Sequence, residues 1–129
     1  AGVQDYVFGV TSHYQGEEAY QLQDLDQVLT QAETLKDQSI ECRMIIDEKG
    51  FLGQVGDAYW FTFSQSTSGE NSAKVLRVRV QGKVPHAIRS WQGVLTLRGQ
   101  VGYHETDSQA IPNGWFLDAD WLAFVPDKN

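Results

Sequence analysis

The sequence predicts a single, mostly β domain in which one amphipathic helix precedes five strands that curl into a barrel. A length of 129 residues fits one domain. Hydrophobic residues make up 41% of the chain and aromatic residues 12%, which is enough apolar material for a core. From about residue 40 onward, apolar and polar residues alternate in short runs, as in strands with one buried face. We therefore expect residues 1–38 to form an N-terminal arm and helix, and residues 39–129 to form the barrel.

The helix is predicted over residues 22–37. Its apolar residues recur at spacings of three and four, which places them in one stripe along the helix. Asp24 and Asp26 suit the positive end of the helix dipole, and Lys36 suits the negative end. The helix is therefore expected to cover a barrel end or a sheet face. The residues of the stripe are Leu22, Leu25, Val28, Leu29, Ala32 and Leu35.

Five strands are predicted after the helix. The third has the cleanest alternation, with aliphatic side chains facing inward and Arg77 and Arg79 facing outward. The first covers residues 40–46 and can continue past a turn-like stretch at residues 47–50 into residues 51–55, since Gly50 and Gly53 allow such a long strand to bend. The predicted strands cover residues 40–55, 58–63, 75–80, 94–101 and 115–125.

The order of these strands favours a curled antiparallel sheet. They follow one another without helical crossovers, which is typical of antiparallel pairing. A bent first strand and an insertion between the third and fourth strands, here around residues 84–91, are features of a five-stranded Greek-key barrel.

Several segments carry a resemblance to a known fold. The strand pair at residues 57–63 and 74–80, the segment 91–101 (WQGVLTLRGQV) and the closing segment 116–121 are similar to the corresponding parts of oligonucleotide/oligosaccharide-binding (OB) domains. The resemblance covers residues 40–126 and is closest to small bacterial domains of the anticodon-binding-like type. It implies an OB-like barrel in a nucleic-acid-binding, exported lipoprotein or periplasmic protein.

Charge is distributed unevenly along the chain. The net charge of −7 opposes general attraction to nucleic acid. Residues 1–38 contain seven acidic side chains and one basic side chain, whereas residues 71–104 contain six basic side chains and no acidic one. The second segment is therefore a local basic region within an acidic protein.

Two groups of residues, in this basic region and on the strand next to it, are candidates for ligand binding. One is the outward face of the second, third and fourth strands, where guanidinium groups can contact phosphates and an exposed tryptophan can stack on a base. The other is the insertion between the third and fourth strands, where His86 accompanies further basic and aromatic residues. The alternatives are a solvated strand face and a plug that closes the barrel. The predicted nucleic-acid-binding residues are Trp60, Arg77, Arg79, Lys83, Arg89, Trp91 and Arg98.

Catalytic and metal-binding motifs are missing from the sequence. It contains neither a Gly-x-Ser-x-Gly elbow nor a phosphate-binding glycine loop, so we expect neither an enzyme nor a cofactor. His13, His86 and His104 are isolated, and no metal site is expected. The single cysteine, Cys42, excludes an internal disulfide and fits a small buried side chain.

The sequence thus predicts a non-enzymatic, OB-like binding module whose ligand is single-stranded nucleic acid or another polyanion. The alternative is a protein-interaction or structural module of the bacterial envelope, in which residues 1–38 contact a protein partner or form a homodimer. The start at Ala1, without Met, fits an exported product, so a periplasmic or lipid-anchored location is expected, with the cytoplasm as the alternative. No apolar run reaches the roughly 18 residues of a membrane span.

Overall fold

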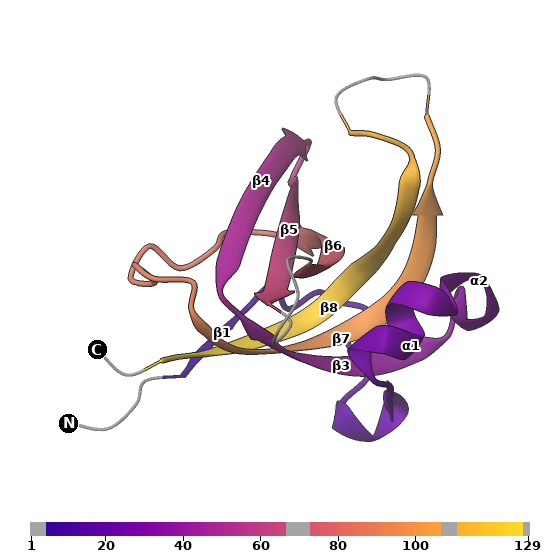
Figure 1. The fold of residues 1–129 in the computed structure, drawn as a ribbon, viewed down its shortest axis with the longest axis horizontal. Helices are drawn as coiled ribbons and strands as arrows, with labels where there is room; N and C mark the ends of the chain where they lie inside the picture. The colour runs from indigo at the N-terminus through magenta and orange to yellow at the C-terminus, as the bar shows by residue number, and fades with distance from the viewer. Residues whose placement is uncertain (1–4, 67–72, 107–110, 128–129) are drawn as a thin grey trace.

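Within the residues that the structure describes, eight strands form one sheet, and three short helices accompany it (Figure 1). The structure is a computed structural model that describes residues 5–66, 73–106 and 111–127. Along the sheet the order is β2-β3-β7-β8-β6-β5-β4, and β1 pairs with β8. The strands are β1 (Tyr6–Phe8), β2 (Gln21–Leu22), β3 (Ser39–Ile46), β4 (Glu48–Val55), β5 (Ala58–Ser66), β6 (Ala73–Gln81), β7 (Gly93–His104) and β8 (Gly114–Pro126). The helices are η1 (Glu17–Ala19), α1 (Leu25–Thr30) and α2 (Ala32–Leu35).

The prediction of a mostly β protein is confirmed, but the predicted five-stranded, OB-like antiparallel barrel is wrong. The sheet is open and mixed, because β6 pairs with β8 in parallel and β2 pairs with β3 in parallel. A single residue, Asp47, separates β3 from β4, yet β3 pairs with β7 while β4 pairs with β5 at the far end of the strand order. The N-terminal segment supplies β1 and β2, which the predicted barrel lacked.

The predicted single helix over residues 22–37 is also wrong in its bounds. Gln31 has a non-helical backbone (φ −121°, ψ 30°) and divides the segment into α1 and α2. Leu22 lies in β2 and is exposed. The buried face of the stripe is nevertheless present, because Leu25, Val28, Ala32 and Leu35 are all buried. Such short helices are held by packing on the sheet rather than by propensity.

The strand positions predicted from alternation are confirmed, except that the stretch predicted as the first strand, residues 40–55, is two strands, β3 and β4, which have different partners. In β6, Leu76, Val78 and Val80 are buried, whereas Arg77 and Arg79 are half-buried on the opposite face. The core continues across the neighbouring strands through fully buried aliphatic and aromatic side chains. Its largest members include Phe63, Phe124, Ile40, Met44, Leu95, Leu97 and Leu122.

The two ends of the bent sheet carry different coverings. In Figure 1, α1 and α2 lie at the right, next to β3 and β7, and the segment that joins β6 to β7 (residues 82–92) lies at the left. That segment is irregular and contains a turn but no helix. A pocket lies beside the helices, and another lies beside residues 82–92.

Candidate functional site

A pocket of about 490 Å³ lies where β4 and β5 meet the segment 82–92. This volume falls within the roughly 300–1,000 Å³ that is usual for ligand pockets. None of the described residues that line it is acidic. We call it the basic-aromatic pocket; it is lined by Lys49, Phe51, Tyr59, Phe61, Lys83, Val84, Pro85, His86, Ile88 and Trp91.

The pairing of β4 with β5 gathers the rings of this pocket. Phe51 pairs with Phe61 and Lys49 with Phe63, and the two-residue period of a strand places Lys49 and Phe51 on one face. The Phe51 and Phe61 ring centroids are 5.6 Å apart, and those of Phe51 and Tyr59 are 6.5 Å apart. Phe51 remains 58% exposed. The pocket thus offers a free aromatic surface to a ligand.

Lys49 is a half-buried cation in contact with aromatic rings. Its Nζ lies 4.6 Å from the centroid of Phe61 and 5.2 Å from that of Trp91, which are cation–π distances. Burial lowers the pKa of Lys49 below its usual value. Among the described residues, no carboxylate forms a salt bridge with Lys49. An anion bound in the pocket would therefore stabilise a charge to which the described residues bring no carboxylate.

Trp91 forms the inner wall of the pocket and is fixed by packing. Its ring centroid lies 5.0 Å from that of Phe124 and 6.0 Å from those of Phe8 and Phe63. Lys83 and His86 are exposed and line the same pocket. The structure thus brings together three members of the group predicted in the insertion. The fourth, Arg89, is exposed and does not line the pocket.

Two residues of the predicted strand face make contacts within the protein. The Arg79 guanidinium donates from Nε and Nη2 to the two carboxylate oxygens of Asp118, each at 3.0 Å. Trp60 is only 2% exposed, and its ring centroid lies 4.7 Å from that of His104 and 4.8 Å from that of Phe116. Trp60 does point away from Phe61, but side chains of β7 and β8 cover it, so it offers no free ring face.

Arg98 is buried in a network of five side chains, which includes an ion pair of 3.6 Å between its Nη2 and Oε1 of the exposed Glu17. Its Nε donates to Glu41 Oε1 at 2.7 Å, and its Nη1 donates to the Tyr14 hydroxyl oxygen at 2.7 Å. The guanidinium carbon lies 3.9 Å from the ring centroid of Trp121. These contacts join β3, β7 and β8 to the segment before η1, so Arg98 holds the N-terminal segment against the sheet.

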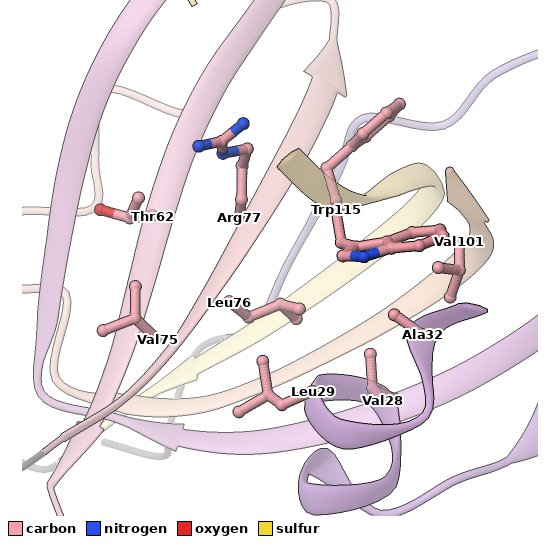
Figure 2. Close-up of a pocket in the computed structure, with 10 residues that line it drawn as sticks. Val28, Leu29, Ala32, Thr62, Val75, Leu76, Arg77, Val101 and Trp115 are labelled. Carbon is pink, nitrogen blue, oxygen red and sulfur yellow. The ribbon is translucent and has the colours of Figure 1, made fainter. Parts of the chain in front are cut away.

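Arg77 lies at a second pocket, beside the helices (Figure 2). Its Nη1 donates to the backbone oxygen of Pro112. The pocket has a volume of about 240 Å³, and we call it the helix-side pocket. It is lined by Val28, Leu29, Ala32, Thr62, Val75, Leu76, Arg77, Val101, Trp115 and Phe116.

The N-terminal segment proposed as a docking arm is part of the sheet. Tyr6–Phe8 form β1, which pairs with the second half of β8, and Phe8 is buried. Tyr20 donates its hydroxyl to Asp120 Oδ2 at 2.7 Å, and burial together with this hydrogen bond raises the pKa of Tyr20 to about 12. This part of the segment therefore contributes to the fold as well as to the acidic surface.

Sequence reasoning missed three residues of the basic-aromatic pocket. Lys49 falls in a stretch that resembles a turn, and Phe51 and Tyr59 were assigned to the strands without a binding role. The available signal was the two-residue spacing of Lys49 and Phe51, opposite the alternating aromatic residues of β5.

In the described parts of the chain, no group of three or more histidine, cysteine, aspartate or glutamate side chains could hold a metal ion. Cys42 is fully buried, and burial raises the pKa of its thiol to about 12. No helix within residues 5–66, 73–106 and 111–127 has the length and hydropathy needed to cross a membrane.

Comparison with known proteins adds no relationship. No protein-family model and no curated protein matches the chain. Function is therefore inferred from the residues of the pocket and their chemistry.

Proposed function

We propose that this domain is a non-enzymatic binding module for single-stranded nucleic acid, and that the basic-aromatic pocket holds one base and an adjacent phosphate. The observation that supports this is that aromatic rings, of which Phe51 is exposed, meet lysines for which the described residues form no salt bridge, in one open pocket. Stacking of a base on an aromatic ring contributes about 1–3 kcal/mol and tolerates any sequence. Lysine supplies a point charge for a phosphate.

Each part of such a unit has a partner in the pocket. Phe51 and Tyr59 offer ring surface for the base, and Trp91, packed against Phe124, backs the pocket. Lys83 and His86 are exposed and available to a phosphate, while the ammonium of Lys49 lies deeper, against Phe61. The net charge of −7 opposes long-range attraction, so affinity depends on these short-range contacts.

The arginine-bearing strand face contributes less to the proposed contact with nucleic acid. Arg79 and Arg98 already bind the carboxylates of Asp118 and Glu41, and a phosphate would have to displace them. Of the residues predicted from sequence, Lys83 and Trp91 therefore carry the proposed contact.

A ring substitution tests the stacking contact. We expect Phe51→Ala to weaken binding of a short fluorescein-labelled oligothymidine by about 1–3 kcal/mol, or roughly 5- to 150-fold, in an anisotropy titration. Phe51 is 58% exposed, so its removal spares the core. Tyr103→Ala is the matched control, because Tyr103 is an exposed ring (45%) that lies outside the pocket. Equal affinities for the Phe51 and Tyr103 variants would contradict the proposal.

A charge substitution tests the phosphate contact. Lys83→Ala should weaken binding to all sequences alike and reduce the slope of log affinity against log salt by about 1. Lys36→Ala removes an exposed lysine outside the pocket and should leave the slope unchanged. A slope that is the same in wild type and in Lys83→Ala would exclude Lys83 as a phosphate ligand.

A further inference from the structure

The helix-side pocket has an apolar end and a cationic end. Val28, Leu76 and Val101 are buried and form apolar walls, to which Trp115 adds an aromatic one. In Figure 2, Leu29, Val28 and Ala32 lie at the end beside the helices, and the Arg77 guanidinium lies at the end away from them. A ligand that fits this arrangement has an apolar body and one anionic group.

Local packing keeps this hollow open. On the helix side, Ala32 presents only a methyl group to the pocket. Lys74 Nζ lies 2.8 Å from Asp26 Oδ1, and this ion pair joins α1 to β6 across the edge of the pocket. Gly102 allows the Phe116 ring to approach β7 closely, since a Cβ at Gly102 would lie 3.0 Å from Phe116 Cζ. The ion pair at the edge and the packing of Phe116 on Gly102 thus help to keep the walls of the pocket apart.

The guanidinium at the cationic end retains donors for a ligand. Of its five N–H donors, one is used by the backbone oxygen of Pro112. In the part of the chain that the structure describes, no carboxylate forms a salt bridge with Arg77, in contrast to Arg79 two residues further on. Guanidinium binds a carboxylate or a phosphate through two parallel hydrogen bonds, and a carboxylate is the smaller of the two groups.

We infer that the helix-side pocket is a second ligand site that binds a small monocarboxylate, with the carboxylate on Arg77 and a ring-sized apolar body against Val28, Ala32 and Trp115. The volume of about 240 Å³ sets the size. It lies below the roughly 300–1,000 Å³ of pockets for larger ligands, and a cavity of about 150 Å³ is known to hold benzene. This inference is independent of nucleic-acid binding, because the two pockets share no lining residue.

Phenylacetate and its neutral analogue phenylacetamide are the probes for this site. Titration of the ¹⁵N-labelled protein, followed by chemical shifts, should show saturable binding of phenylacetate at the residues of the pocket. We expect the amide to bind at least about tenfold more weakly, since it lacks the charge that Arg77 recognises. Arg77→Gln should abolish the preference for the acid over the amide. Arg43→Gln is the control and should preserve this preference, because Arg43 is an exposed arginine on β3.

A second variant tests occupancy without changing charge. Ala32→Leu places a larger side chain into the hollow and should block both probes. Both residues are strong helix formers, so we expect an unchanged circular dichroism spectrum and unchanged oligothymidine binding. The inference is overturned if phenylacetate does not bind at millimolar concentration, if acid and amide bind wild type equally, or if Ala32→Leu binds phenylacetate as wild type does. If wild type does not bind oligothymidine, only the nucleic-acid proposal is overturned.

Discussion

Replacement of Glu41 by alanine is expected to reduce the free energy of unfolding by about 3–5 kcal/mol, because it removes the buried carboxylate that pairs with the buried charge of Arg98. Glu41 is 6% exposed and Arg98 is 8% exposed, and Arg98 Nε lies 2.7 Å from Glu41 Oε1. Little water can reach the guanidinium to replace the lost carboxylate. The remaining contacts with Tyr14 and Trp121 are uncharged. Glu17 Oε1 lies 3.6 Å from Arg98 Nη2, but the Glu17 side chain is 74% exposed, so water weakens this ion pair.

Urea denaturation measures this loss, and a neighbouring ion pair provides the control. Arg43 Nε lies 3.4 Å from Glu41 Oε2, but the Arg43 side chain is 64% exposed. Arg43→Ala should therefore cost at most about 1 kcal/mol, as exposed ion pairs do. Glu41→Leu combined with Arg98→Met should recover most of the loss, since it removes both buried charges. If Glu41→Ala costs no more than Arg43→Ala, Arg98 does not depend on this pair and is free for a ligand.

The second large effect is expected at Gly99. A Cβ at this position would lie 2.0 Å from the backbone oxygen of Asp118 and 2.9 Å from the Cα of Ala119. The register of β7 and β8 shifts between Arg98 and Gly99, so both strands are already irregular at this point and the backbones lie close together. Gly99→Ala should therefore lower the free energy of unfolding by about 3 kcal/mol, at the upper end of the usual cost of overpacking.

Gly102 on the same strand is the matched control for this substitution. Its Cβ would lie 3.0 Å from Phe116 Cζ, an atom of a side chain that can shift. Gly102→Ala should cost about 1 kcal/mol by the same urea measurement. A larger loss in Gly102→Ala than in Gly99→Ala would show that the close approach at the irregular register does not constrain the strands.

Local periodicity was sufficient to locate most strands but not to pair them. The alternation over residues 75–80 predicts β6 because one face of that strand is buried and the other is not. Parallel pairing of β6 with β8 leaves no local mark, since it depends on residues about forty positions apart, such as Val78 and Leu117. β1 and β2 contain three and two residues, too few for a periodic pattern to appear.

The break in the helix had no recognisable signal either. Gln31 is a good helix former, and nothing in its immediate neighbourhood resembles a helix end. Packing on the sheet decides its conformation, because Val28 before it and Ala32 after it are both buried.

At the candidate site, too, the sequence predicts on which face of a strand a residue lies but not which residues cover it. Alternation correctly places Trp60 opposite Phe61, but it does not show that His104 and Phe116 cover Trp60. Likewise, the carboxylate partner of Arg79 lies 39 residues away along the chain. Lys83 and Trp91 could be grouped from sequence because they lie in one short segment. Their meeting with rings from β4 and β5 required the structure.

The central claim is that the basic-aromatic pocket, rather than the arginine-bearing strand face, contacts single-stranded nucleic acid. Chemical shifts of the ¹⁵N-labelled protein during titration with short oligothymidine test this most directly. The account predicts that the perturbed amides cluster at residues 49–51, 59–61 and 83–91. Perturbations concentrated instead around Arg77, Arg79 and Arg98, or a spectrum that oligothymidine leaves unchanged, would contradict it.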